Sequence, residues 1–307
     1  MEKEIYLRKK IQQLIKKGFG QGAGRDYKPF LHIGDFASKG RGHRVYGVKT
    51  QRVHHLFSDA ELRYFYLLEW DDNVIDIREQ YPLFYGDESE KISEQIHCLK
   101  GKNDEQEIIG TERIAYNRGI EHPTYSQTDI PVVMTTDFLY LFKTDIGIEY
   151  RARSVKIESD LVDKRVREKQ TIEFNYWTQF GINWKLVTEN SCNKIKCANI
   201  GGILAYYKYP LTNVLPEELK ADAINRLLRA VVYEGGRLSI ITSRLDKYYQ
   251  LPTGSMLSLF FHLAAHKVFP VYLDRPFWAT KRVEDLVNID ALTELIELGG
   301  HSYEHSS

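Results

Sequence analysis

The sequence predicts an α/β domain over residues 1–189 and a mostly helical, winged-helix-like domain over residues 190–307. Patterns in the first part follow the order helix, strand, strand, strand, helix, strand, which is typical of an α/β fold. The second part is mostly helical and includes a helix, a turn, a second helix and a short strand, the pattern of a winged helix. With 307 residues, 43% of them hydrophobic, the chain can fill the cores of two domains.

Positive charge is concentrated at the N-terminus. The whole chain has 42 basic and 42 acidic residues, whereas residues 1–56 hold 13 basic residues against 4 acidic ones. Residues 3–17 predict a basic amphipathic helix. The glycine-rich residues 18–24 follow a helix rather than a strand, so they predict a flexible basic connector and not a dinucleotide-binding loop.

Residues 39–56 complete this basic arm. Their alternating Val and Tyr predict strands, and their cations are interleaved with glycine. A charged run can be an ordinary solvated face, but the concentration of the positive excess in one arm favours contacts with DNA phosphates. The candidate phosphate contacts are Lys39, Arg41, Arg44, Lys49 and Arg52.

The next helix begins with a capping box. Ser58 is followed three residues later by Glu61, the spacing at which the two side chains satisfy the first backbone N–H groups of a helix. Residues 73–82 then alternate as a strand. Residues 86–110 are polar and charged, and they predict a surface insertion without a catalytic role.

Two β-rich segments, residues 132–142 and 148–157, are separated by a short turn, which predicts an antiparallel hairpin. Residues 161–180 predict a long charged helix that ends before Gly181. Residues 184–188 predict the last strand of the α/β domain.

Helical patterns dominate the C-terminal part. A helix follows Pro216, and two more helices, over residues 238–251 and 255–267, meet at a turn at residues 252–254. A short strand is predicted at residues 268–272. The helix over residues 255–267 has large apolar residues on more than one face, which predicts a protein-binding surface rather than a DNA-reading helix.

A carboxylate inside an apolar strand is the first sign of chemistry. Burying Asp137 would cost several kcal/mol unless another group pairs with it. On the neighbouring strand Ser154 and Lys156 share one face, and Val155 points the other way. If the hairpin register brings Asp137 to Lys156, the two strands and Glu61 form a divalent-metal nuclease site in which the acids hold Mg²⁺. The alternative is a solvated Asp–Lys pair and a Glu61 that only caps its helix.

Longer segments resemble the TnsA endonuclease subunit of heteromeric cut-and-paste transposons. They are GQGAGRDYKPFLHI, VHHLFSDAEL, EWDDNVIDIREQYPL, MTTDFL and SVK, in this order. The resemblance implies a restriction-endonuclease-like α/β domain, with a mixed sheet flanked by helices, that cuts the 5′ ends of the transposon with Mg²⁺, or Mn²⁺ as its substitute. It also implies three partners, namely the double-stranded transposon ends, a TnsB-like transposase that cuts and joins the 3′ ends, and a TnsC-like AAA+ ATPase that contacts the C-terminal domain.

The resemblance also assigns roles residue by residue. Glu61 matches the helix glutamate, Asp137 the metal-binding aspartate and Lys156 the catalytic lysine of the family, and Val155 would offer its backbone carbonyl to the metal. Ser154 stands where the family usually has glutamine. A serine hydroxyl is shorter and a weaker Mg²⁺ ligand, so a water would bridge Ser154 to the metal.

Two other functions compete with this interpretation. A DNA-binding adaptor that does not cleave is favoured by Ser154, and it is opposed by the intact Glu61, Asp137 and Lys156. A stand-alone restriction-type nuclease is the other alternative, although the neutral net charge and the second domain favour a subunit of a complex.

The remaining polar residues predict ordinary structural roles. Glu69, Asp76 and Glu79 are predicted to be surface or capping groups. The adjacent His54 and His55 would point to opposite sides of an extended segment, so they would not bind one metal together.

Cysteine spacing and hydropathy predict the cellular compartment of the protein. Cys98, Cys192 and Cys197 are irregularly spaced, which predicts reduced thiols and neither a disulfide framework nor a zinc site. The sequence has no run of about 18 apolar residues and no signal peptide at its start. We therefore expect a soluble protein of the bacterial cytoplasm that does not enter a membrane.

Overall fold

The computed structural model describes residues 2–34, 41–83, 86, 108–208 and 215–298. The chain divides into two compact units, Met1–Cys192 (unit 1) and Asn193–Ser307 (unit 2). Most of the predicted insertion at residues 86–110 lies outside the described residues, as do Lys39 and Cys98. Among the helices that the structure describes, none combines the length and the apolar character needed to cross a membrane.

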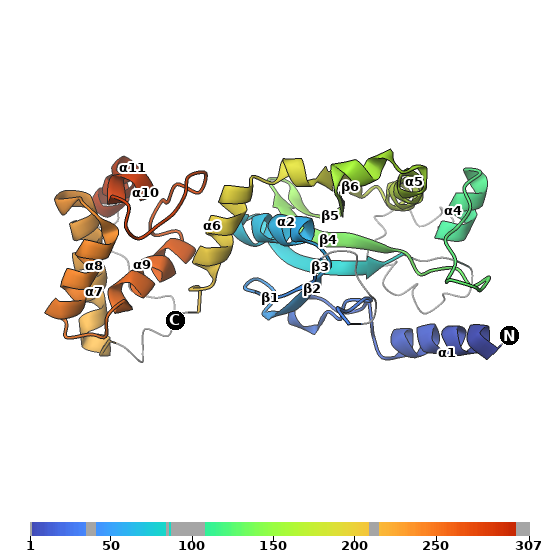
Figure 1. Ribbon diagram of the computed structural model, residues 1–307, viewed down its shortest axis with the longest axis horizontal. Coiled ribbons are helices and arrows are strands. Elements are labelled where there is room, and N and C mark those ends of the chain that lie inside the picture. Colours follow the sequence, from blue (N-terminus) through green and yellow to red (C-terminus); the bar gives the residue numbers. More distant parts are fainter. Residues whose placement is uncertain (1, 35–40, 84–85, 87–107, 209–214, 299–307) are drawn as a thin grey trace. The chain divides into compact units, whose positions relative to one another are not determined.

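A mixed sheet forms the centre of unit 1 (Figure 1). Its strands, in the order β3-β4-β5-β6, are β3 (Val74–Pro82), β4 (Thr135–Thr144), β5 (Gly147–Lys156) and β6 (Asn183–Thr188). The predicted hairpin is confirmed, since β4 and β5 are antiparallel from Phe138↔Arg153 to Thr144↔Gly147. β6 is parallel to β5, because helix α5 (Lys164–Thr178) carries the chain back between them.

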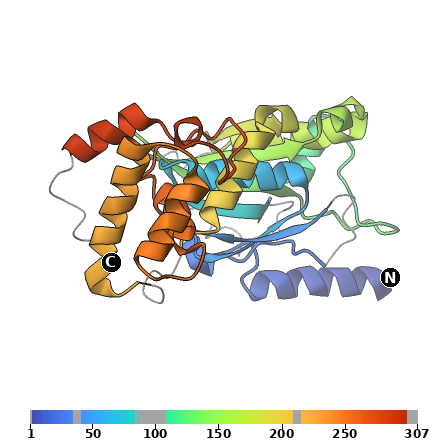
Figure 2. The ribbon, with the colours of Figure 1, turned by 60° about the vertical axis from the view of Figure 1, so that its left-hand side comes forward.

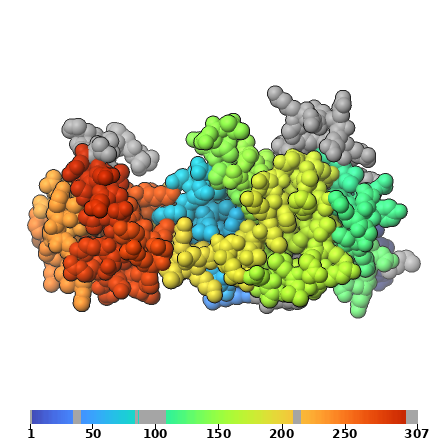
Figure 3. All heavy atoms as spheres, turned by 90° about the horizontal axis from the view of Figure 1, so that it is seen from above, coloured from blue at the N-terminus to red at the C-terminus, as the bar shows by residue number. Residues whose placement is uncertain are grey.

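Helices cover both faces of β4. Phe138 lies against Tyr64 of α2 (Asp59–Trp70), with 5.7 Å between the ring centroids. The next residue, Leu139, packs in a buried cluster with Ile172 and Trp177 of α5. Neighbouring residues of a strand point to opposite faces, so α2 and α5 lie on opposite sides of the sheet. Seen from above, the yellow-green segment that includes α5 covers much of unit 1 (Figure 3).

The N-terminal arm is packed against the rest of unit 1. Helix α1 (Glu2–Lys16) buries Ile11 in a cluster with Phe30, Ile130 and Val133. It lies on the same side of the sheet as the hairpin of β1 (His43–Gly47) and β2 (Arg52–Leu56), as Figures 1 and 2 show.

The glycine stretch after α1 is a fitted segment rather than a flexible connector. Gly20 has a φ of +76°, and a Cβ atom there would lie 2.3 Å from Cγ of Pro82. The Gly24 N–H donates to Asp76 of β3 at 3.1 Å. The predicted flexibility is therefore wrong, because glycine is needed for the close approach of this segment to β3.

Short helical segments connect these elements in unit 1. They are η1 (Gly24–Asp26), α4 (Thr111–Asn117), η2 (Glu158–Val162) and η3 (Glu189–Ser191).

Unit 2 is largely helical. Its helices are α6 (Lys194–Leu204), α7 (Glu217–Arg229) with the π-helical turn η5 (Ala230–Glu234), α8 (Leu238–Tyr248), α9 (Ser255–Ala265), α10 (Val283–Leu286) and α11 (Ile289–Leu298). The predicted turn between α8 and α9 is confirmed, and buried Asp246 fixes it by accepting from the N–H groups of Gly254 and Met256 at 2.7 and 2.8 Å. The predicted strand at residues 268–272 is reduced to one β-bridge, Val271↔Val287.

Candidate active site

Asp137 is buried near the start of β4 and has the partners that its burial requires. It is 8% exposed, and its Oδ2 accepts hydrogen bonds from Lys156 Nζ and from the Val155 N–H, both at 2.7 Å. Ser154 Oγ donates to the same oxygen at 3.4 Å. The predicted juxtaposition of Asp137 and Lys156 is therefore present, and the pair lies inside the protein rather than on a solvated edge.

Lys156 connects two of the predicted metal ligands. Its ammonium donates to Oδ2 of Asp137 and, at 3.0 Å, to the backbone carbonyl of Val155. Burial alone would lower the pKa of Lys156, but the carboxylates of Asp137 and Glu173 outweigh burial and raise that pKa above its ordinary value. The amine is therefore a cation held between two oxygen atoms.

Glu61 approaches this pair from α2. It is 6% exposed, and its carboxylate accepts from the Phe57 N–H at 2.9 Å and from Ser58 Oγ at 3.0 Å. The Glu61 N–H donates in turn to Ser58 Oγ at 3.1 Å, as the predicted capping box requires. Burial and the negative charge of Asp137 raise the pKa of Glu61 to about 7. Glu61 thus serves both its helix and the carboxylate cluster.

Glu173 of α5 is a fourth ionisable group that the sequence patterns did not reveal. It is 2% exposed, and its Oε1 accepts from Thr136 Oγ1 at 2.9 Å and from Trp184 Nε1 at 3.0 Å. Burial and the charge of Asp137 raise its pKa to about 7. In the sequence Glu173 belongs to a charged helix. Only its spacing from the apolar Ile172 and Trp177 could have predicted that it lies on the face of α5 that packs against the sheet.

The donor set of this site fits a divalent cation bound by oxygen. Within the described ranges, no cluster of three or more His, Cys, Asp or Glu side chains could hold a metal ion. The predicted set instead combines two carboxylates, of Glu61 and Asp137, with the carbonyl of Val155. Asp137 Oδ2 and the Val155 carbonyl already converge on one positive charge, the Lys156 ammonium. Mg²⁺ takes one or two carboxylates and keeps several waters, so these residues suit it.

Ser154 supports Asp137 rather than standing apart from it. The side chain is 1% exposed, and its hydroxyl donates to the aspartate. Val155 buries its side chain on the other face, as predicted, while its backbone groups face Asp137 and Lys156.

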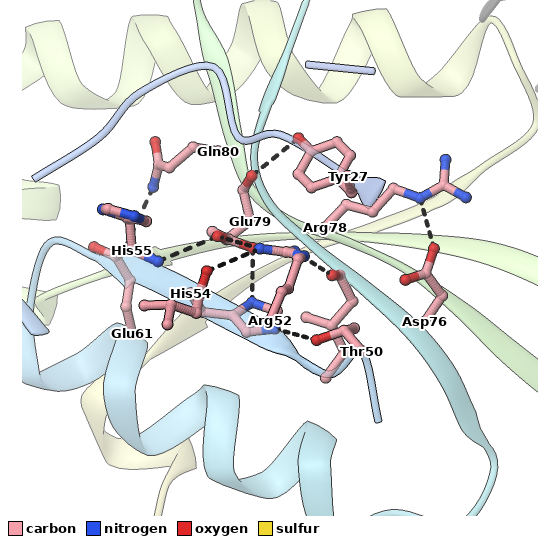
Figure 4. A network of polar contacts seen from close by, with 12 residues as sticks. Tyr27, Thr50, Arg52, His54, His55, Glu61, Asp76, Arg78, Glu79 and Gln80 are labelled. Carbon is pink, nitrogen blue, oxygen red and sulfur yellow. Dashed lines mark hydrogen bonds and ion pairs between the residues drawn. The ribbon is translucent and has the colours of Figure 1, made fainter. Parts of the chain in front are cut away.

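A second buried network adjoins the site, between β2 and β3 (Figure 4). Both guanidinium ends of Arg52 bind Glu79, at 2.8 and 2.5 Å, and His54 Nδ1 lies 2.7 Å from Glu79 Oε2. Burial opposes the ionisation of Glu79, but His54 and Arg52 lower its pKa well below the ordinary value. His54 also bonds to Thr50, at 2.6 Å. This network fastens the β1–β2 hairpin to the sheet.

The structure corrects several predictions about these polar residues. Arg52 is 9% exposed, and its guanidinium is fully used by Glu79 and by backbone carbonyls, so its predicted contact with DNA phosphates does not fit. Glu69, Asp76 and Glu79 are 6%, 5% and 0% exposed, so their prediction as surface groups is wrong. Each has a partner distant in the sequence, and such partners are invisible to local patterns.

Three other predicted phosphate contacts, Arg41, Arg44 and Lys49, are described, and they lie in or beside the β1–β2 hairpin. Arg41 and Arg44 are exposed, and Lys49 is half-buried at the hairpin turn. Arg44 donates to the Ile33 carbonyl at 2.9 Å.

Comparisons with known proteins show the family of this chain. Residues 71–189 match the family described as TnsA-like endonuclease N terminal, and residues 192–273 match TnsA endonuclease C terminal. The chain is 35% identical over 290 residues to transposon Tn7 transposition protein TnsA from Escherichia coli, which covers 92% of this chain and 94% of the relative. The chain belongs to the TnsA endonuclease family.

Membership of the TnsA family confirms the resemblance found in the sequence. The TnsA-like N-terminal match includes Asp137, Lys156 and Glu173, and it begins ten residues after Glu61. Glu61 lies close to these groups in space although its helix precedes the matched segment, because α2 packs on the face of the sheet that carries Phe138.

Proposed function

We propose that this protein is a Mg²⁺-dependent endonuclease subunit of a transposase that cuts the 5′ ends of transposon DNA. The observation that carries the proposal is the buried group of Asp137, Lys156 and Glu61, joined by the carbonyl of Val155. Two buried carboxylates that lie close together repel each other, and a bound cation would relieve that repulsion. The similarity to a transposition protein supports transposon DNA as the substrate.

Each residue has a definite role in this proposal. Asp137, Glu61 and the Val155 carbonyl would hold Mg²⁺, which when bound polarises the scissile phosphate and acidifies the attacking water; Mn²⁺ would substitute. Lys156, anchored by Asp137, presents positive charge that offsets the charge developing on the phosphate. Ser154 donates to Asp137 and would contact the metal only through water. Asp137 and, to a lesser extent, Glu173 favour the protonated form of the Lys156 amine.

The DNA would run along the hairpin of β1 and β2, with Arg41 just before it, which we call the basic hairpin. Arg41, Arg44 and Lys49 are the described candidates for phosphate contacts, and Lys39 stays a prediction. Phosphate contacts of this kind position a protein on DNA without reading its sequence.

The resemblance to the TnsA family supports the protein partners that we propose. A TnsB-like transposase would cut and join the 3′ ends, and a TnsC-like AAA+ ATPase would bind unit 2. Unit 2 has an apolar groove between α6, α9 and the segment that contains Trp278, whose side chain is 63% exposed. An exposed aromatic residue at a groove is typical of a protein-binding surface.

Substitution of the two central residues tests the nuclease. Asp137→Ala and Lys156→Ala should abolish cleavage of transposon-end DNA in Mg²⁺ and, in the wild type, a chelator should have the same effect. Asp145→Ala is the matched control, because Asp145 is an exposed carboxylate in the turn of the same hairpin. Wild-type cleavage by either active-site variant would remove the site from consideration.

The same assay separates the rival functions. A non-cleaving adaptor, which Ser154 favoured, would bind transposon ends in Mg²⁺ and leave the 5′ ends uncut even with the transposase and the ATPase present. A stand-alone restriction-type nuclease would cut DNA in the absence of both partners.

A further inference from the structure

Gln80 has a backbone conformation that glutamine rarely adopts. Its φ is +50°, in the left-handed region, although it lies inside strand β3. Pairing with β4 continues on either side, with Glu79 opposite Phe138 and Tyr81 opposite Thr136. Gln80 therefore lies directly across from Asp137. Strained residues that the surrounding structure maintains often occur at functional sites.

The left-handed residue breaks the alternation of side chains along β3. Glu79 and Tyr81 would share one face of a regular strand. Glu79 instead points to the hairpin, where it binds Arg52, whereas the ring of Tyr81 packs on the α5 side, 5.8 Å from the ring of Trp177. This break frees the side chain of Gln80 to lie on the side of α2.

The carboxamide of Gln80 joins α2 to β4. Gln80 is 4% exposed, its Nε2 donates to Oε2 of Glu61 at 3.4 Å, and its Oε1 accepts from Thr135 Oγ1 at 2.9 Å. The Thr135 hydroxyl fixes the orientation of the amide. Because it donates to Oε1 of Gln80, the NH₂ group at the other side of the amide faces Glu61. The close-up in Figure 4 places Gln80 and Glu61 in one network.

We propose that Gln80 is a positioning residue that fixes the carboxylate of Glu61 so that Glu61 and Asp137 bind one divalent cation together. The inference rests on the proposed function. The other donors to Glu61, Phe57 and Ser58, come from the start of its own helix. Gln80 is the described donor that ties Glu61 to the strands carrying Asp137. Residues that orient metal ligands in this way commonly contribute 10–100-fold to metal affinity or activity.

A variant of Gln80 and a pair of variants at Thr135 separate the carboxamide from the backbone. Gln80→Asn keeps an amide and suits a positive φ, but it is one methylene too short to reach Glu61. Thr135→Val removes the hydroxyl that orients the amide, whereas Thr135→Ser keeps it. If Gln80→Asn failed to fold, the Thr135 pair would still decide the question.

The first measurement is equilibrium binding of Mn²⁺ to the full chain, monitored through the electron paramagnetic resonance signal of free Mn²⁺. The second measurement is the dependence of the cleavage rate on Mg²⁺ concentration. We expect Gln80→Asn to weaken Mn²⁺ binding about 10–100-fold without lowering the melting temperature. Thr135→Val should weaken binding in the same direction, and Thr135→Ser should bind as the wild type does. The Michaelis constant for DNA should not change.

Asp137→Ala distinguishes the possible failures. If Asp137→Ala loses Mn²⁺ while Gln80→Asn and Thr135→Val bind it normally, the inference about Gln80 is wrong and the proposed function stands. If wild type and Asp137→Ala bind Mn²⁺ equally, or neither binds it, the proposed function and the role of Gln80 are both overturned.

Discussion

Glu79 and Glu173 are both buried carboxylates, yet their surroundings shift the pKa in opposite directions. Glu79 faces Arg52 and His54, which lower its pKa, whereas burial and Asp137 raise the pKa of Glu173 to about 7. Opposite pKa shifts of similar groups distinguish Glu79, a structural carboxylate that stays charged, from Glu173, which lies beside the proposed metal site.

Removal of Arg52 should destabilise the protein strongly. Arg52→Ala leaves the charge of Glu79 buried without its bidentate partner, and such losses amount to roughly 3–5 kcal/mol. Arg44→Ala is the control, because Arg44 is an exposed arginine in the same hairpin and should change the free energy of unfolding little. Urea denaturation measures both, and equal stabilities would show that the Arg52–Glu79 pair is not needed.

Stability should depend on pH through Glu173. Its folded-state pKa of about 7 exceeds the ordinary 4.5, so the native protein binds more protons than the unfolded chain between these values. Stability is therefore lost as pH rises through this window, by on the order of 3 kcal/mol at about 1.4 kcal/mol per pKa unit. In buffer that contains a chelator, the free energy of unfolding of Glu173→Gln should fall less between about pH 5 and pH 8 than that of the wild type. Parallel pH curves would contradict this assignment.

At the scale of elements, periodicity and short turns predicted much of unit 1. The β4–β5 hairpin follows from two β-rich runs around a tight turn, and its register brings Asp137 to Lys156. Long-range partners could not be predicted in this way. Arg52 resembles its exposed neighbours in the sequence, and only the fold brings Glu79, 27 residues later, to its guanidinium.

Other elements were missed for related reasons. The left-handed Gln80 carries no local signal, because glutamine is not a turn residue. Helix α6 has glycines near its end, and α10 is a single turn, so neither gives a strong helical pattern. The strand predicted at residues 268–272 finds only one partner, since α10 and α11 follow it instead of a second strand.

The basic hairpin should account for part of the salt dependence of DNA binding. Each phosphate contact contributes about −0.9 to the slope of log K against log salt, so replacing Arg41, Arg44 and Lys49 by alanine should flatten the slope by up to about 2–3. Arg52 is left intact because its loss would unfold the hairpin. Gel shifts at several salt concentrations measure the slope, and an unchanged slope would show that this hairpin does not contact DNA.

For the whole molecule, the division after Cys192 separates the nuclease centre from a helical unit with its own core. In unit 2 Phe260 stacks on Phe269, with 4.4 Å between their rings, and Asp246 fixes the turn between α8 and α9. All the residues that we assign to cleavage lie in unit 1, and we propose that unit 2 binds partners.

A fragment that begins near Ser191 should therefore bind the partner ATPase and have little affinity for DNA. Its helix α9 buries six residues and shows one cation beyond its end, Lys267, so it lacks the donors that read base edges. Pull-down with the ATPase and a gel shift at physiological salt measure both properties. Sequence-specific DNA binding without retention of the ATPase would reverse the assignment.

We propose that Asp137, Lys156 and Glu61 cut the 5′ ends of the transposon. The most direct measurement maps the cut on each strand of transposon-end DNA in reactions that contain the transposase, the ATPase and Mg²⁺. With wild-type protein we expect cuts on both strands, and with Asp137→Ala the 5′ cuts should disappear while the 3′ cuts of the transposase remain. Persistent 5′ cuts in the Asp137→Ala reaction would contradict the claim.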